Sequence, residues 1–154
     1  MRSTSGAERG LAVHRVIELI GQKVPADKAC ETLGLKPNDP DFQAPASAAP
    51  VFIEAVSSRF HPVELHWEVP IIAHDKAGST INGTIDLLVE TDNGYWIVDH
   101  KSDETDDRKE RFARYWPQLN CYAKALSEGM AMTVAGIAIH WVCYGEISCL
   151  TGQI

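Results

Sequence analysis

The feature that most constrains the fold is a pair of apolar segments joined by a tight turn. Residues 81–90 and 95–101 are rich in β-branched and aromatic side chains, and Asn93-Gly94 lies between them. An Asn-Gly pair between two such segments is the strongest short-range signal of a β-hairpin, because both residues tolerate the positive φ of the turn. The sequence therefore predicts two antiparallel strands over these ranges.

This hairpin is expected to bring three charged side chains together. Asp99 and Lys101 are two residues apart on the second strand, so they share one face. Counted outward from the turn, Asp86 on the first strand falls close to cross-strand register with Asp99. An Asp-x-Lys pair on a strand is often only a solvated ion pair. On a strand this apolar, however, several charges are costly unless they are paired or bind a cation.

Two carboxylates and an ammonium suit metal-assisted hydrolysis of a phosphodiester. A Mg²⁺ or Mn²⁺ ion held by carboxylate oxygens polarises the phosphate and lowers the pKa of bound water. We assign Asp86 and Asp99 as metal ligands, with the backbone carbonyl of His100 as a further oxygen donor. Lys101 is assigned to orient or deprotonate the attacking water, or to stabilise the developing charge. Glu68, on the preceding strand, is a candidate acid in the outer shell.

Helices are predicted before the hairpin. Residues 10–21 carry apolar side chains at helical spacing and end at a glycine, and residues 26–34 form a second, shorter helix. Residues 36–50 hold four prolines and are predicted to be mainly loop, with a further helix starting near Pro50.

The rest of the chain predicts an α/β (α+β) fold. Residues 64–71 alternate apolar and polar side chains and extend the hairpin to an antiparallel meander. A helix over 108–127 follows, then an apolar strand over 132–144 and an edge strand over 146–150. We therefore expect one domain, residues 1–154, with a mixed β-sheet flanked by helices.

Four short motifs resemble those of one nuclease family. The segment GTIDLLVETDNGYWIVDHKSD resembles the PD-(D/E)xK nuclease superfamily, and within it the nuclease domains of RecB/AddA-type helicase–nucleases. Gly10–His14 is similar to the G-x-x-x-H of that family's first helix, and Gln118–Tyr122 to its Q-x-x-x-Y motif. The pieces occur in family order across about residues 10–126.

The resemblance implies a restriction-endonuclease-like core and further site residues. It makes His14 a metal ligand, although a histidine at the edge of an apolar face is more often a satisfied boundary residue. It also places Gln118 and Tyr122 at the site, where they would hydrogen-bond the DNA backbone or buttress Lys101. Their i, i+4 spacing does put them on one helix face.

The implied activity is that of a Mg²⁺- or Mn²⁺-dependent DNA nuclease. The resemblance points to the nuclease part of an ATP-dependent helicase–exonuclease in double-strand-break repair and recombination, acting on single strands. The polar chain ends agree with a piece of a longer protein, and no Walker motif is present. Helicase domains are therefore expected elsewhere in the polypeptide or in a partner subunit.

The charge of the chain gives weak evidence against nucleic acid. The net charge is −7, whereas phosphate binding favours a basic surface. Bound cations offset acids at a metal site. The candidate phosphate contacts flank the start of the helix over 108–127, and a solvated face is about as probable for each: Arg108, Lys109, Arg111 and Arg114.

The sequence also bears on compartment and cofactors. It has no apolar stretch of the roughly 18 residues that a membrane helix needs, and no secretory h-region, so we expect a cytoplasmic protein with no membrane partner. The cysteines are then expected to be reduced. No iron–sulfur cluster is expected, because a close Cys-x-x-Cys pair is absent.

Two other functional classes remain open at this point. The same fold serves as a non-enzymatic DNA-binding or subunit-interface module in inactivated relatives, and a metal hydrolase with another substrate fits the acidic charge. An inactivated copy should lack at least one of four side chains, and all are present: His14, Asp86, Asp99 and Lys101.

Overall fold

The computed structural model describes residues 6–151. Its elements in chain order are α1 (Gly6–Gly21), α2 (Ala26–Leu33), α3 (Pro40–Phe60), β1 (Glu64–His74), β2 (Thr80–Thr91), β3 (Gly94–Lys101), α4 (Arg108–Lys124), a π-helical turn η1 (Ala125–Gly129), β4 (Val134–Trp141) and β5 (Glu146–Thr151).

The five strands form one mixed sheet in the order β1-β2-β3-β4-β5. The pairs β1–β2, β2–β3 and β4–β5 are antiparallel, whereas β3 and β4 are parallel. Parallel neighbours need a crossover connection, and α4 supplies it. The predicted antiparallel meander within a mixed sheet flanked by helices is confirmed.

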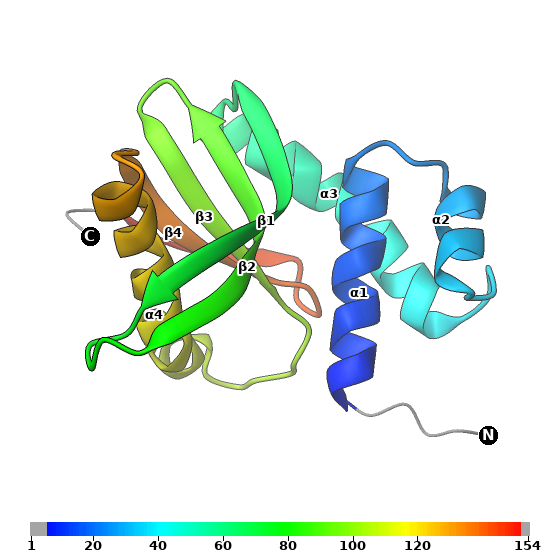
Figure 1. Cartoon of the computed structure of the whole chain (residues 1–154). Coiled ribbons are helices and arrows are strands. Elements are labelled where there is room, and N and C mark those ends of the chain that lie inside the picture. The colour runs from blue at the N-terminus through cyan, green and yellow to red at the C-terminus, as the bar shows by residue number, and fades with distance from the viewer. Residues whose placement is uncertain (1–5, 152–154) are drawn as a thin grey trace.

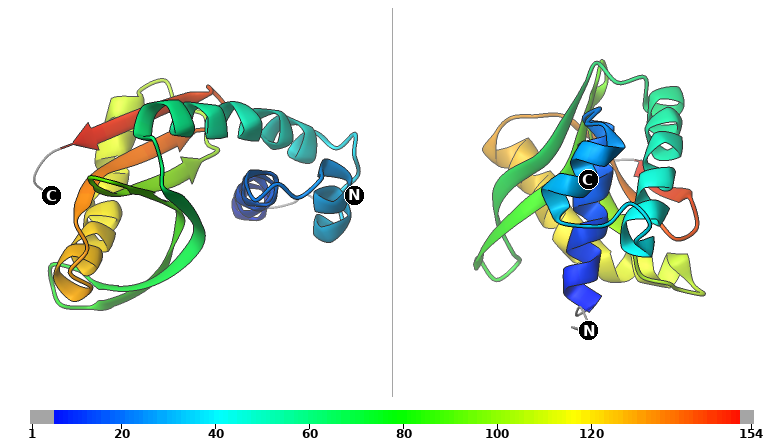
Figure 2. Two further views of the ribbon diagram at one scale, coloured as in Figure 1. Left: turned by 90° about the horizontal axis from the view of Figure 1, so that it is seen from above. Right: turned by 90° about the vertical axis from the view of Figure 1, so that its right-hand side faces the viewer.

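Helices cover both faces of the sheet (Figure 1). On one face α4 packs Leu119 and Tyr122 against Ile97 and Ile137. On the other face α1 and α3 bury their apolar sides against the sheet, through Val13, Ile17, Phe52, Val56, Leu87 and Val98. The additional views show β1 and β2 strongly curved, with α1 and α4 on different sides of these strands (Figure 2). The site residues on α1 and on α4 therefore approach the sheet from different sides.

The loop predicted over residues 36–50 is wrong, because α3 begins at Pro40. Asp39 caps this helix by accepting a hydrogen bond from the backbone N–H of Asp41. A proline inside a helix costs roughly 3 kcal/mol, and both Pro45 and Pro50 lie inside α3. One face of the helix is nevertheless buried, with apolar side chains three or four residues apart: Phe42, Pro45, Ala49, Phe52, Val56 and Phe60. Burial of a Phe or Val contributes about 1.5–3 kcal/mol, so this face outweighs the two prolines.

Other predicted boundaries shift by a few residues. α1 begins at Gly6 rather than at residue 10, and β1 continues to His74. The predicted helix over 108–127 is divided into α4 and the π-helical turn η1. No helix within residues 6–151 combines the length and the apolar character needed to cross a membrane.

Candidate active site

The register of the β2–β3 hairpin brings Asp86 and Asp99 to neighbouring positions on the two strands. Leu87 pairs with Val98, and the next position in that register sets Asp86 opposite Asp99. Both residues are only 8% exposed. The backbone N–H of His100 donates a 2.7 Å hydrogen bond to Oδ2 of Asp86, which ties the first carboxylate to the strand of the second. The predicted convergence of Asp86 and Asp99 is therefore present in the structure.

An irregularity in β1 lies directly across from Asp86. Trp67 pairs with Leu87 and Val69 with Ile85, while Glu68 between them has φ 49° and makes no ladder pair. A positive φ at a residue other than glycine is strained, and residues in such conformations cluster at functional sites. Ile85 and Leu88 both pack on the α4 side, although they are three residues apart. The usual alternation of β2 is thus broken at Asp86.

The first helix brings an imidazole to the same carboxylate. Nδ1 of His14 lies 3.4 Å from Oδ1 of Asp86. Burial opposes the charged form of His14, but the hydrogen bond and charge of Asp86, with the charge of Asp99, outweigh burial and raise the pKa of His14. Burial likewise opposes ionisation of Asp86, yet the contact with His14 holds its pKa below the ordinary value. The contact therefore favours the protonated form of His14 and the ionised form of Asp86.

Lys101 is paired with the second carboxylate. Its Nζ lies 2.7 Å from Oδ2 of Asp99 and 4.2 Å from the centroid of the Tyr115 ring. Burial and the nearby charge of Asp86 raise the pKa of Asp99 to about 6, although Lys101 acts in the opposite direction. Burial would lower the pKa of Lys101, but Asp99 outweighs it and raises the pKa. The site therefore holds two crowded acids whose negative charge a cation would relieve.

Gln118 and Tyr122 lie on α4 above this pair of strands. Nε2 of Gln118 donates a 2.9 Å hydrogen bond to the Tyr122 hydroxyl. That hydroxyl rests on the backbone of Gly83, where an added Cβ would lie only 2.1 Å from it. Burial raises the pKa of Tyr122, and the charges of Asp99 and Asp86 add to the effect. Tyr122 of the helix motif is thus in contact with Gly83, the glycine of the segment Gly83-Thr84-Ile85-Asp86.

The side chain of His100 points away from the carboxylates and into the core on the α1–α3 side. Its Nδ1 lies 2.9 Å from Nδ1 of His140, and both rings contact Phe52. Burial and His140 lower the pKa of His100 to about 3, and burial lowers the pKa of His140 to about 4, so both are neutral at pH 7. The main chain of His100 lies beside Asp86, and the role of its carbonyl oxygen stays a prediction.

The four basic residues at the start of α4 have different surroundings. Arg108 pairs with Glu146 and stacks on Tyr144, and Arg114 pairs with Glu110. Lys109 lines a separate shallow groove with aromatic side chains of α4. Arg111 alone of the four lines the cleft that contains His14 and Lys101, where its Nε lies 3.9 Å from Oδ2 of Asp103.

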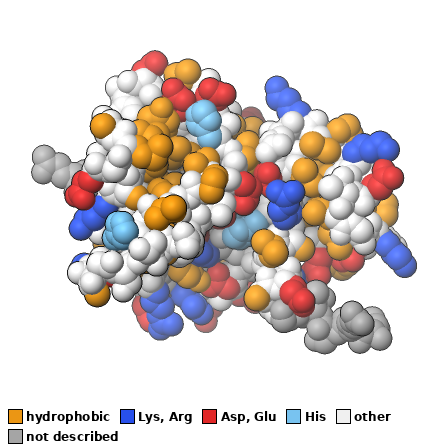
Figure 3. All heavy atoms as spheres, in the orientation of Figure 1, with side chains coloured by type: hydrophobic (Ala, Val, Ile, Leu, Met, Phe, Trp, Pro, Cys, Tyr) orange, Lys and Arg blue, Asp and Glu red, His pale blue; other side chains and the backbone are white. Residues whose placement is uncertain are grey.

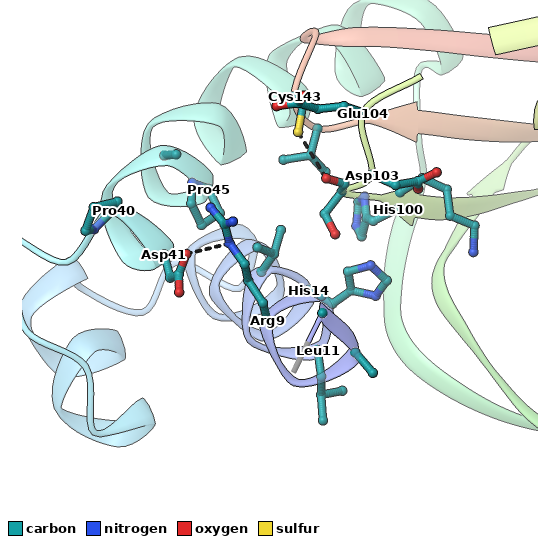
Figure 4. Close-up of a pocket in the computed structure, with 18 of the residues that line it drawn as sticks. Arg9, Leu11, His14, Pro40, Asp41, Pro45, His100, Asp103, Glu104 and Cys143 are labelled. Atoms are coloured by element: carbon teal, nitrogen blue, oxygen red, sulfur yellow. Dashed lines mark hydrogen bonds and ion pairs between the residues drawn. The ribbon is translucent and has the colours of Figure 1, made fainter. Parts of the chain in front are cut away.

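A cleft of about 1130 Å³ is lined by His14 and Lys101. Its lining does not include four of the assigned site residues: Asp86, Asp99, Gln118 and Tyr122. Acidic, basic and histidine side chains gather along the seam between α1 and the sheet (Figure 3). In the close-up, His14 reaches from α1 toward the strands, and Arg9 is paired with Asp41 on the far wall (Figure 4). The walls come from α1, the start of α3, the segment after β3 and α4: Arg9, His14, Asp41, Lys101, Asp103, Arg111 and Tyr115.

The ligand types of His14, Asp86 and Asp99 fit a divalent cation, although their ligand atoms do not all lie around a single position. Within the described residues, Oδ2 of Asp99 is buried and has an ion-pair partner but no hydrogen bond. Two buried carboxylates and an imidazole are ligands that Mn²⁺ and, for the oxygens, Mg²⁺ accept. The ligand atoms of His14, Asp86 and Asp99 are not all within 4.8 Å of one another, because the Asp99 carboxylate turns to Lys101.

Among residues 6–151, a different group of acidic and histidine side chains has its ligand atoms within that distance. Glu64, His66 and Glu90 have ligand atoms within 4.8 Å of one another on β1 and β2. Glu90 is four residues from Asp86 along β2, which is about 13 Å. This group is separate from the cleft, and His66 already pairs with Glu90 at 2.8 Å.

Two residues at or behind the site were not assigned from the sequence. Tyr115, which faces Lys101, precedes Gln118 by three residues and Tyr122 by seven, so helical periodicity alone was a usable signal. His140 interrupts the apolar run of β4 and supports His100 from behind. A lone histidine in a buried strand suggests an internal polar partner, but the sequence does not say which one.

Comparison with known proteins identifies one family. A model described as the PD-(D/E)XK nuclease superfamily matches residues 2–145, nearly the whole chain. No curated protein matches the chain. The five-stranded mixed sheet flanked by helices is consistent with the restriction-endonuclease-like fold of that superfamily.

Proposed function

The chain belongs to the PD-(D/E)XK nuclease superfamily, and from this premise we propose that it is a divalent-metal-dependent deoxyribonuclease. Membership in this superfamily implies that the chain is a metal-dependent nuclease and thus a hydrolase. The substrate, the metal and the residues that act are our proposal.

One observation carries the proposal: two buried acids, a lysine and a histidine meet where β2 and β3 run side by side. His14 lies 3.4 Å from Asp86, and Lys101 lies 2.7 Å from Asp99. Each acid has a basic partner, and burial together with the charge of Asp86 raises the pKa of Asp99 to about 6. Such clustered, shifted groups beside a cleft are typical of catalytic sites.

His14, Asp86 and Asp99 are the residues that would hold the metal, with the His100 carbonyl as a further donor. A bound Mg²⁺ or Mn²⁺ ion supplies Lewis-acid polarisation of the phosphate and lowers the pKa of water. The 3.4 Å contact between His14 and Asp86 keeps the imidazole facing the carboxylate. The hydrogen bond from His100 fixes the other oxygen of Asp86.

Lys101 and the α4 residues would act on the substrate side. The raised pKa of Lys101 keeps it protonated at neutral pH, so we assign it to orient the attacking water and to stabilise charge on the phosphate rather than to remove a proton. Gln118 and Tyr122 form a hydrogen-bonded pair on the same helix and are assigned to the DNA backbone or to the support of Lys101. Arg111, in the cleft wall, is the first of the four basic residues that we assign to a phosphate.

The narrower assignment rests on the order and spacing of the motifs. We propose a RecB/AddA-type nuclease domain, part of a longer helicase–exonuclease that acts on single-stranded DNA in double-strand-break repair and recombination, in the cytoplasm. Support comes from the four motifs, which occur in family order, and from the cleft of about 1130 Å³ that His14 and Lys101 line. Helicase domains in the same polypeptide or a partner subunit would then supply the strand.

Cleavage assays on point variants test the proposal. Labelled single-stranded DNA is incubated with the wild type, Asp99→Ala and Lys101→Ala in Mg²⁺, in Mn²⁺ and in EDTA. Metal-dependent cleavage by the wild type and its loss in both variants, with nearly unchanged thermal melts, is the expected result. Because an isolated nuclease domain can be slow without its motor, the assay uses enzyme in excess over DNA and long incubation.

The remaining outcomes decide between the alternatives. Wild-type-like cleavage by both variants would contradict the assignment of Asp99 and Lys101 to the active site. Tight DNA binding without cleavage in any metal would favour a non-enzymatic DNA-binding module. Metal-dependent hydrolysis of RNA or of a small phosphodiester, with DNA untouched, would favour a hydrolase with another substrate.

A further inference from the structure

Lys101 has two partners in the site, and only one of them is charged. Its Nζ lies 2.7 Å from Oδ2 of Asp99 and 4.2 Å from the centroid of the Tyr115 ring. A cation within about 6 Å of an aromatic centroid and over the ring face is attracted by the ring quadrupole. The side chain of Lys101 is 19% exposed, so water screens this contact only in part.

The ring of Tyr115 is itself held in place. Its hydroxyl donates to Oδ2 of Asp103 at 3.2 Å, and its ring is tilted against the buried ring of Trp141, with centroids 6.5 Å apart. Asp103 also lies 3.9 Å from Arg111. The aromatic face under Lys101 is therefore fixed at its hydroxyl end and supported by the core.

We propose that Tyr115 is a positioning residue, whose ring face holds the Lys101 ammonium at the cleavage site together with Asp99. The proposal rests on the proposed function, in which Lys101 acts on the substrate. In this proposal the ring face of Tyr115 positions the Lys101 ammonium, and the hydroxyl only anchors the ring. Tyr115 lies outside the four motifs that identify the family.

The two partners have different properties, which gives the ring a distinct task. A carboxylate that is shared between Lys101 and a second cation attracts the ammonium less strongly than one that serves Lys101 alone. The ring carries no net charge and cannot be recruited in that way. Tyr115 would therefore keep the ammonium in place whatever else Asp99 binds.

A pair of substitutions separates the ring from the hydroxyl. Tyr115→Phe keeps the ring and removes the contact with Asp103, whereas Tyr115→Leu removes the ring and keeps an apolar side chain. Phe112→Leu is the matched control, because Phe112 lies one turn earlier on α4 and stacks on Trp116 instead of Lys101. Thermal melts of all three variants show whether each one is folded.

The first readout is independent of activity. Protons over a ring face are shifted upfield, so the ε-methylene signal of Lys101, assigned by its loss in Lys101→Arg, is expected upfield in the wild type and in Tyr115→Phe. The same signal should return to the usual lysine position in Tyr115→Leu and stay shifted in Phe112→Leu. A Lys101 signal that is unshifted in the wild type, or unmoved in Tyr115→Leu, would overturn the proposed contact even if the enzyme is inactive.

The second readout is kinetic. Tyr115→Leu is expected to lower kcat roughly 3- to 30-fold with KM little changed, the range that a cation–π contact of this exposure implies, and Tyr115→Phe should restore most of it. Equal losses in Phe and Leu variants would assign the effect to the hydroxyl and Asp103 and overturn the ring as its source. If the wild type does not cleave at all, the proposed function fails, while the Lys101 signal still decides the contact.

Discussion

The Tyr122 hydroxyl lies directly over the backbone of Gly83, so close that a Cβ added to Gly83 would be 2.1 Å from the hydroxyl oxygen and 2.6 Å from Cζ. Gly83 lies on β2 three residues before Asp86, and Tyr122 lies in the last turn of α4, four residues after Gln118. The close approach therefore fixes how far α4 lies from the strands that carry the two carboxylates, and it requires a glycine at position 83.

The first prediction concerns this close approach. Gly83→Ala should lower the free energy of unfolding by about 1–3 kcal/mol, because the ring of Tyr122 must move to admit the methyl group. In a Tyr122→Leu background the same substitution should cost much less. Urea unfolding of the four proteins in this cycle gives the coupling. Gly129→Ala is the control, since an added Cβ there meets nothing within 4 Å. Additive effects of the two substitutions would contradict the contact.

The second prediction concerns metal binding. Mg²⁺ or Mn²⁺ should raise the melting temperature, because a ligand that binds the folded state at 100 times its Kd contributes about 2.7 kcal/mol. Asp86→Asn and Asp99→Asn should each remove most of this gain. Glu90→Gln serves as the control, because it disrupts the separate group of Glu64, His66 and Glu90. Loss of the metal effect in Glu90→Gln alone would place the bound ion there instead.

The third prediction concerns His14. His14→Ala should lose most metal-dependent cleavage while the protein stays folded, since the imidazole is partly exposed and lies outside the apolar core. His74→Ala, at the exposed end of β1, should cleave like the wild type. Cleavage rates at saturating and limiting Mn²⁺ distinguish weaker metal binding from a slower reaction. Unchanged rates at limiting Mn²⁺ would exclude His14 as a ligand.

The fourth prediction compares two arginines of α4. Arg111→Ala should weaken binding of single-stranded DNA and reduce the dependence of log affinity on log salt concentration by about 0.7, as loss of one phosphate contact implies. Arg114→Ala should have little effect, because Arg114 pairs with Glu110 and does not line the cleft. Binding measured by fluorescence anisotropy in Ca²⁺ at several salt concentrations checks both. Equal effects of the two variants would remove Arg111 from the assigned phosphate contacts.

The fifth prediction concerns pH and the buried histidines. The pKa of His140 is about 4 in the folded protein, because burial disfavours its charged form, and near 6.5 in an unfolded chain. Between these values the unfolded chain takes up a proton that the folded protein refuses, so stability falls as pH drops from about 6.5 to about 4. The loss from this residue is on the order of 3 kcal/mol.

A non-titrating variant isolates that contribution. His140→Asn should start less stable at pH 7, because it loses the stacking on Phe52, and should then lose less stability than the wild type on acidification. Urea unfolding at pH 7, 6, 5 and 4.5 measures the difference between the two proteins. Parallel curves for the two proteins would mean that His140 does not resist protonation in the folded state.

Much of the site geometry was predictable because it is local. The turn at Asn93-Gly94 sets the register of β2 and β3, and the period of two then fixes which side chains lie together. Asp86, Asp99 and Lys101 were located by counting from that turn. Helical spacing put Gln118 and Tyr122 on one helix face, but their assignment to the site came from the resemblance to the family motif.

The features that sequence reasoning missed depend on distant packing. Pro45 and Pro50 indicated a loop, because their cost is visible in the sequence whereas the sheet surface that compensates it is not. The contact of Tyr115 with Lys101 requires the return of the chain through α4, and that of His140 with His100 requires the parallel pairing of β3 and β4. The positive φ of Glu68, which interrupts the ladder opposite Asp86, has no signal in residue type.

His14 reaches the site from a helix, whereas Asp86 and Asp99 belong to the strands. A hairpin and its hydrogen bonds join the two acids directly, so their arrangement depends only on neighbouring strands. The imidazole depends on α1, which packs on α3 and, through Val13 and Ile17, on the sheet. The proposed ligand set is therefore complete only when the helical half is docked on the sheet, so metal affinity would report on the tertiary fold as well as on the hairpin.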